Sequence, residues 1–164
     1  MEIIKRKTMN YQEIKKTEEY KGDRNCCTVV SCSIVFDTPF KEMQSFFFNH
    51  MGRKKNKGIY FETSRVKKVA ENFGYKITAL IDGGTPSKNK SQYKGMTANN
   101  CAKYLDNGTY ILGCKGHVLA FKNGIVEDWT KGRYHRINRI WKVEKAEKIV
   151  KSSQNFFNEF LQTL

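Results

Sequence analysis

No stretch of the sequence approaches the ~18 consecutive apolar residues that a membrane-spanning helix requires. The first residues, Met1–Lys7, lack the apolar core and the small-residue cleavage site of a secretory signal peptide. We therefore expect a soluble, intracellular protein with no membrane partner. Its expected location is the cytoplasm, or the host cytoplasm if the protein is viral.

Cysteine pairs at metal-binding spacing are also absent. The chain has no Cys-x-x-Cys pair, so the sequence predicts neither a zinc site nor a disulfide framework, and nothing in it implies a metal or an organic cofactor. In a reducing compartment an odd number of cysteines is typical of free thiols, most of them small buried hydrophobic residues. The five are Cys26, Cys27, Cys32, Cys101 and Cys114.

Acidic residues are scarce. The chain has 16 Asp and Glu against 30 Lys and Arg, which gives a formal net charge of +14. Such an excess attracts polyanions such as nucleic acid or acidic protein faces, and it equally serves solubility. The densest basic cluster, residues 53–57, lies between Gly52 and Gly58. We expect an exposed, solvated loop there, with a partner-binding patch as the alternative.

The chain has the size and composition of one domain. It has 164 residues, of which 39% are hydrophobic and 13% aromatic, enough to bury a core. No repeat, low-complexity tract or linker divides it. We expect a single domain over residues 1–164, in which residues 1–24 form an irregular arm with a short helical piece near Tyr11–Tyr20.

Local patterns predict helices first and strands afterwards. The first part is expected to contain a helix from Thr38-Pro39 to Gly52, a helix over 64–73, a strand over 75–81, a loop over 82–96 and a short helix capped by Thr97. The second part is expected to contain strands over 110–114, 117–122, 125–130 and 134–143, then an amphipathic helix over 144–164. Helices followed by a meander indicate an α+β fold, with the helices packed on a C-terminal antiparallel sheet.

The Asn123-Gly124 dipeptide predicts a two-residue hairpin turn that sets the register of its strands. Leu119 then lies opposite Asp128, and His117 becomes a diagonal neighbour of Asp128, with Cα atoms roughly 7–8 Å apart. A carboxylate so placed can orient an imidazole and stabilise its charged form. The alternative is a charged pair on a solvated sheet face, and a slip of one residue would separate the two.

The same register turns Glu127 and Trp129 to the opposite face of the hairpin. We expect Trp129 to pack in the core. Glu127 is expected to be solvated or paired with a lysine.

The apolar run over residues 28–36 allows two interpretations. Its β-branched residues favour a strand, but its length fits a buried helix equally well. If the run is a helix, Cys27 opens it, where the helix N-terminus and a nearby imidazolium lower a thiol pKa. The backbone N–H of Cys27, and the amide of Asn25, then become available to an oxyanion. If the run is a strand, Cys27 is an ordinary core residue.

These segments resemble the papain-like cysteine proteases, and more closely the small bacteriophage and bacterial members of that superfamily. The resemblance spans residues 24–143 and includes the start of the apolar run and a Pro-aromatic second helix. It also includes a Gly-His-apolar strand, a short turn and an aspartate. The segments that carry it are Cys27-Thr28-Val29-Val30-Ser31, Thr38-Pro39-Phe40, Gly52-Arg53-Lys54, Gly58, Gly108-Thr109-Tyr110, Gly116-His117-Val118-Leu119-Ala120 and Asn123-Gly124-Ile125-Val126-Glu127-Asp128-Trp129.

The resemblance implies a papain-like fold, a helix over residues 28–36 and a catalytic triad. Cys27 would be the nucleophile, His117 the base and then the acid, and Asp128 the orienting group. The chain departs from the pattern at Cys26, where the family has Asp, and at Val30, where it has Arg. Cys26 is therefore the alternative nucleophile.

The expected function is that of a thiol hydrolase that cleaves a peptide, isopeptide or related amide through a thioester. The positive charge favours acidic or nucleic-acid-associated protein substrates. Two alternatives remain open at this point. One is a papain-like binding protein with a vestigial triad that acts on a host or viral partner. The other is a basic nucleic-acid-binding domain in which the triad is coincidental.

Overall fold

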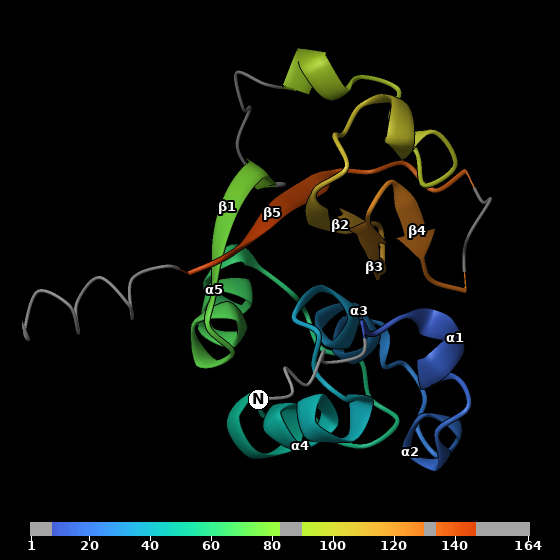
Figure 1. The fold of residues 1–164 in the computed structure, drawn as a ribbon, viewed down its shortest axis with the longest axis vertical. Helices are drawn as coiled ribbons and strands as arrows, with labels where there is room; N and C mark the ends of the chain where they lie inside the picture. The colour runs from blue at the N-terminus through green and yellow to red at the C-terminus, as the bar shows by residue number, and fades with distance from the viewer. Residues whose placement is uncertain (1–7, 83–89, 130–133, 147–164) are drawn as a thin grey trace, which may run out of the picture.

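Helices occupy the first part of the chain and a sheet most of the rest, as Figure 1 shows. The computed structural model describes residues 8–82, 90–129 and 134–146. Within those ranges the helices are α1 (Tyr11–Ile14), α2 (Glu18–Lys21), α3 (Cys27–Val35), α4 (Phe40–His50) and α5 (Thr63–Asn72), with short 3-10 turns η1 (Lys90–Tyr93) and η2 (Cys101–Lys103). The predicted α+β class is confirmed.

One antiparallel sheet combines all the described strands, which are β1 (Tyr75–Asp82), β2 (Thr109–Cys114), β3 (His117–Lys122), β4 (Ile125–Glu127) and β5 (Arg139–Lys145). Their order is β1-β5-β2-β3-β4. The prediction of a simple meander is therefore wrong for the last strand, because β5 crosses back and pairs with both β2 and β1. This crossing gives β2 a neighbour on each side and leaves β1 and β4 at the edges.

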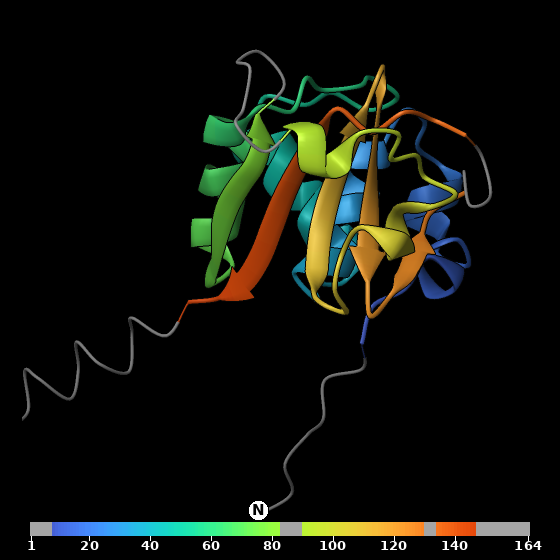
Figure 2. The ribbon, with the colours of Figure 1, turned by 90° about the horizontal axis from the view of Figure 1, so that it is seen from above.

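The sheet is covered on both faces. Figure 2 shows helices α3, α4 and α5 on one side and the segment that contains η1 and η2 on the other. Successive strand residues point to opposite faces, so Ile111 and Ala120 join the helix-side core, while Leu112 and Phe121 join the second core. Burial on both faces explains why β2 and β3 are apolar at almost every position.

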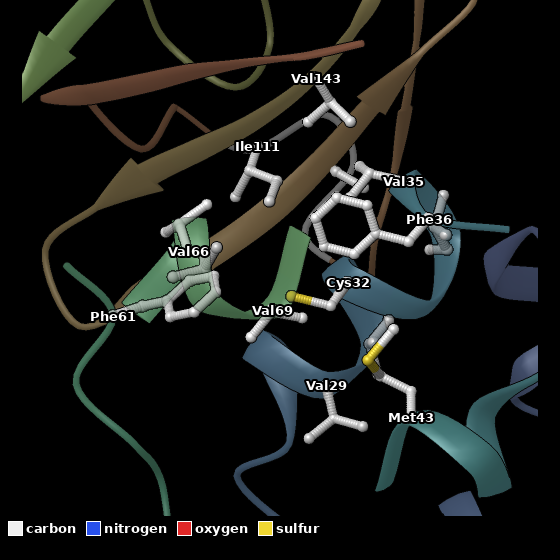
Figure 3. Close-up of a cluster of buried hydrophobic side chains, with 14 of the residues drawn as sticks. Val29, Cys32, Val35, Phe36, Met43, Phe61, Val66, Val69, Ile111 and Val143 are labelled. Carbon is white, nitrogen blue, oxygen red and sulfur yellow. The ribbon is translucent and has the colours of Figure 1, made fainter. Parts of the chain in front are cut away.

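Helix α3 is the centre of the helix-side core. Every residue from Thr28 to Val35 is buried, and Figure 3 shows Val29 and Cys32 of this helix among apolar side chains from α4, α5 and the sheet. Full burial of one such aliphatic side chain is worth ~1.5–3 kcal/mol, which exceeds the weak strand preference of the β-branched residues. The helical interpretation of this run is confirmed.

The short helical piece predicted near Tyr11–Tyr20 is present as α1 and α2, whose first turns are capped by the side chains of Asn10 and Thr17. The expectation of a mainly irregular arm is wrong for the described residues of this segment, because they pack on the domain. Ile14 is fully buried in the helix-side core. The segment is polar in composition but contains one apolar side chain, that of Ile14, whose burial holds the segment against the domain.

The basic cluster after Gly52 begins with a buried residue, which corrects the expectation of a wholly solvated loop. Residues 54–57 are exposed, but Arg53 is buried and makes a bidentate ion pair with Asp23, at 2.7 and 2.9 Å. Asp23 also accepts hydrogen bonds from Gln44 and from the backbone N–H of Asn56. This pair joins the loop before α3 to the loop after α4.

We expect Asp23→Ala to destabilise the protein by about 3–5 kcal/mol, because it leaves the Arg53 guanidinium buried and unpaired. Chemical denaturation measures the effect, and Glu18→Ala, which removes an exposed pair with Lys21, is the control with an expected loss below ~1 kcal/mol. Equal losses from both variants would contradict this role.

Because of the same ion pair, we expect the free energy of unfolding to depend on pH in the acidic range. Burial opposes ionisation of Asp23, but hydrogen bonds from Arg53, Gln44 and Asn56 outweigh it and lower its pKa to about 2. The contribution of ionised Asp23 to the free energy of unfolding is therefore complete above the ordinary pKa of 3.8 and is lost as the pH falls towards 2.

Some predicted boundaries are corrected. The helix predicted from Thr38-Pro39 begins one residue later, with Pro39 at the N-cap. The helix predicted after Thr97 is only the turn η2, and the Asn100 side chain before it accepts the Thr97 N–H. The helix predicted over 64–73 and the strand over 75–81 are confirmed within one residue.

The strand predicted over 134–143 and the helix predicted over 144–164 differ more from the structure. The strand predicted from residue 134 begins only at Arg139. Glu144 and Lys145 end β5 instead of starting a helix, and the rest of the predicted C-terminal helix, residues 147–164, lies outside the described residues. Residues 83–89 of the predicted loop lie outside them too. None of the described helices has the length and apolar character needed to cross a membrane.

Candidate active site

The hairpin of β3 and β4 has the predicted register. Asn123 and Gly124 have φ angles of 54° and 79°, as a type I′ turn requires, and Lys122 pairs with Ile125. The side chains of His117 and Asp128 meet as expected, with 2.7 Å between Nε2 and Oδ2. The predicted contact between them is confirmed.

This pair is not on a solvated sheet face. The side chain of His117 is 12% exposed and that of Asp128 is fully buried. Burial alone would lower the pKa of His117, but the hydrogen bonds to Asp128 and Cys27, with the charge of the carboxylate, raise it to about 9. The imidazole is therefore held in its charged form at neutral pH.

Cys27 is the first residue of α3, and its thiol lies against His117. Burial opposes ionisation of the thiol. The hydrogen bonds of His117 and of the Val118 backbone, and the charge of the imidazolium, outweigh it and hold the Cys27 pKa below its ordinary value of 9.0. A buried imidazole, a carboxylate and an activated thiol thus form one contiguous row.

Cys26 has the opposite character. It is 4% exposed, and burial raises the pKa of its thiol to about 11. Burial also raises the pKa values of Cys32, Cys101 and Cys114. All five cysteines are free thiols, and Cys27 alone among them has a lowered pKa, which distinguishes it from its neighbour.

One prediction for the residues beside Asp128 is wrong. Trp129 is not in the core: it is 39% exposed, and its ring lies edge-on to His117 with 4.9 Å between centroids. Glu127 is half-buried, and its carboxylate accepts the backbone N–H of Tyr11 at 3.0 Å, a contact that the sequence did not predict. The strand alternation stops with β4 at Glu127, so it does not govern Trp129.

Tyr11, at the start of α1, thus contacts both residues adjacent to Asp128. The Tyr11 ring packs on Trp129, with 6.0 Å between centroids, while its N–H holds Glu127, the residue before Asp128. Sequence reasoning missed Tyr11, since no local signal connects it with a strand more than 100 residues away.

A pocket of about 350 Å³ opens beside the thiol. Asn25, Cys27, His117 and Trp129 are among the residues that line it. The remaining lining residues are Thr28, Gly58, Ile59, Tyr60, Phe61, Gly113, Cys114, Gly116, Val118, Arg139 and Trp141. Their mixture of aromatic walls and a few polar groups is typical of small-molecule and peptide sites.

The loop before α3 is fixed where it borders this pocket. Asn25 has a φ of 53°, a left-handed conformation that asparagine tolerates well, and its side-chain amide donates to the Asn56 carbonyl at 3.0 Å. Arg53 donates to the Arg24 carbonyl at 3.0 Å. The buried ion pair of Arg53 and Asp23 thereby positions the residues that immediately precede Cys27.

The other histidines lie differently. The His135 ring is 6.3 Å from the His117 ring between centroids. His50 is the last residue of α4. Among the described residues, no group of three or more His, Cys, Asp or Glu side chains is arranged to hold a metal ion.

Comparison with models of known protein families, with curated proteins and with solved structures found no match for this chain. The inference of function therefore depends on the geometry of the site.

Proposed function

We propose that the protein is a thiol hydrolase that cleaves a peptide, isopeptide or related amide bond with Cys27, His117 and Asp128. One observation carries the proposal: His117 contacts Asp128 on one side and Cys27 on the other, and the Cys27 pKa is lowered while that of His117 is raised. Opposite shifts of this kind favour a thiolate–imidazolium pair, the form in which a cysteine attacks a carbonyl.

In the first half of the reaction, the Cys27 thiolate attacks the carbonyl carbon of the substrate amide. The His117 imidazolium then gives its proton to the amine as the C–N bond breaks, which leaves a thioester. Asp128 keeps the ring in place through its hydrogen bond to Nε2. In the second half, His117 takes a proton from water, the resulting hydroxide attacks the thioester, and the carboxylic acid leaves as Cys27 is released.

The oxyanion of each tetrahedral intermediate needs hydrogen-bond donors beside the thiol. The Cys27 backbone N–H at the start of α3 is one, since the first N–H groups of a helix have no partner within it. The Asn25 side chain borders the same pocket, and its NH₂ group has a second hydrogen besides the one directed at Asn56.

The proposal includes a relationship to the papain-like cysteine proteases, in particular to small bacteriophage and bacterial members. It is supported by the order Cys27, His117, Asp128 along the chain and by the motifs around them. The proposed location is the cytoplasm, and the proposed substrates are acidic or nucleic-acid-associated proteins, which the net charge of +14 would attract.

Alkylation by iodoacetamide tests the proposal, since only the thiolate reacts. We expect the rate at Cys27, followed by mass spectrometry, to reach half its plateau at a pH below 9, because the Cys27 pKa is lowered. Hydrolysis of a substrate would in addition fall above about pH 9, as His117 loses the proton that the leaving amine needs.

The buried thiol of Cys26 is the internal control, and it is expected to react only after unfolding. If Cys27 reacted no faster than Cys26 in the folded protein, the hydrolase proposal would be wrong. A binding role for the same fold would then be favoured.

A further inference from the structure

Arg139 lies in the same pocket as Cys27 and takes no part in the proposed chemistry. It begins β5, between β1 and β2, and is half-buried. No ion pair with a carboxylate is found for it within the described parts of the chain. Its charge is thus available to whatever enters the pocket.

The guanidinium is held in one place. Nη1 donates to the Phe61 carbonyl at 3.0 Å and Nη2 donates to the Tyr60 hydroxyl, while its central carbon lies 5.0 Å from the centroid of the Tyr60 ring. Each terminal nitrogen carries a second hydrogen, and two parallel N–H groups match the two oxygens of a carboxylate. A fixed guanidinium binds such a group with little loss of side-chain entropy.

Gly113 allows this arrangement. It pairs with Arg139 across β2 and β5 and also lines the pocket. A Cβ atom at Gly113 would lie 3.0 Å from the Arg139 Cβ, which is closer than ordinary packing allows. The absence of a side chain leaves room for Arg139 beside the pocket wall.

Two carboxylates lie near Arg139, and one of them, Asp82, is opposite it across β1 and β5. Glu62 and Asp82 line an adjacent hollow of about 340 Å³ that shares Tyr60 and Arg139 with the pocket. Glu62 accepts from the Ser64 hydroxyl and Asp82 from the Thr63 hydroxyl. Neither Glu62 nor Asp82 is among the residues that line the thiol pocket, whereas Arg139 lines both.

We propose that Arg139 is the specificity-determining residue of the site and binds a carboxylate of the substrate close to the scissile bond. The carboxylate belongs either to an acidic side chain or to the C-terminus of a peptide. This inference rests on the proposed hydrolase function and deepens it, because it names the chemical group that the pocket selects.

Two alkylating reagents separate this inference from the proposed function. Iodoacetamide is neutral and reports activation of the thiol, whereas iodoacetate carries a carboxylate and also reports attraction to the pocket. The quantity measured is the rate of Cys27 alkylation by iodoacetate divided by the rate for iodoacetamide. We expect Arg139→Gln to lower this ratio about fivefold to tenfold, with the iodoacetamide rate nearly unchanged.

Lys142→Gln is the matched control. Lys142 also belongs to β5 and its replacement removes one positive charge, but it is not among the residues that line the pocket. We expect the ratio to stay at the wild-type value in this variant. Circular dichroism and the Tm verify that both variants fold. Arg139→Lys keeps the charge but loses the paired donors, so its ratio should be intermediate.

Protection of Cys27 from iodoacetamide identifies the source of the carboxylate. N-acetylaspartate α-amide offers a side-chain carboxylate, and N-acetylalanine offers a C-terminal one. The corresponding neutral compounds are N-acetylasparagine α-amide and N-acetylalanine amide. We expect one acid to protect the wild type better than its neutral counterpart, and not to protect Arg139→Gln.

Two results would overturn the inference while leaving the hydrolase proposal intact. One is an unchanged alkylation ratio in Arg139→Gln with rapid iodoacetamide labelling. The other is protection by neither acid, or equal protection by acids and amides. Failure of Cys27 to react with either reagent would instead overturn the hydrolase proposal and this inference with it.

Discussion

Cys27→Ala is expected to lose all rapid labelling of the folded protein by cysteine-directed acyl probes, and Cys26→Ala is expected to keep it. The two thiols are adjacent in sequence but opposite in character. Cys27 lies against His117 with a lowered pKa, whereas Cys26 is buried with a pKa raised to about 11. Since only the thiolate attacks, the difference in rate at neutral pH should exceed about 100-fold.

The comparison of these two variants also decides between the two candidate nucleophiles. Both replacements create a similar small loss of volume at the start of α3, so a difference between them reports chemistry and not folding. Intact-mass measurement after a short exposure to the probe gives the result. Labelling that survives Cys27→Ala and disappears in Cys26→Ala would transfer the proposed role to Cys26, and labelling that survives both would exclude either thiol.

Replacement of Asp128 should have the second largest effect. Asp128→Ala removes the carboxylate that hydrogen-bonds His117 and raises its pKa. The His117 pKa should then fall from about 9, and the Cys27 thiolate should lose the charged partner that stabilises it. We expect the iodoacetamide rate at pH 7 to fall about 10- to 100-fold, with its half-plateau at higher pH, as one to two units of pKa imply.

Asp128→Asn separates the charge from the hydrogen bond, because the amide oxygen still accepts from the ring. It should give a smaller loss than Asp128→Ala, and NMR titration of the His117 ring should show a lowered pKa in both variants. Asp106→Asn is the control, since this exposed carboxylate accepts hydrogen bonds from Tyr110 and Gly108, outside the site. An unchanged alkylation profile in Asp128→Ala would show that the carboxylate does not activate the pair.

The contact of His117 with Asp128 was predictable from the sequence because it is local. A two-residue turn fixes the pairing of the strands on either side of it, and eleven residues then suffice to place the imidazole beside the carboxylate. The same reasoning failed one residue later, at Trp129. The strand ends at Glu127, and Trp129 instead packs on Tyr11 from a helix that no local rule connects to it.

The helical state of residues 27–35 could not be predicted from local preferences. The run has β-branched residues and is apolar at almost every position. Its apolar residues therefore show neither the spacing of an amphipathic helix nor the alternation of a half-buried strand, and the pattern does not distinguish the two. Burial between the sheet and the helices α4 and α5 decides the matter. The position of Cys27 at a helix N-terminus, and hence its electrostatic surroundings, is a consequence of that packing.

The sequence by itself determined the α+β class, the hairpin and the pairing of His117 with Asp128, since each depends on composition or on neighbours along the chain. Only the tertiary structure decided which thiol meets the imidazole, how Asp23 and Arg53 hold the loop before it, and that Arg139 borders the same pocket. These contacts join segments separated by 30 to 112 residues, from Asp23 and Arg53 to Cys27 and Arg139. Their partners are selected by the burial of a shared core and by the neutralisation of buried charge, and neither is encoded in any short stretch of chain.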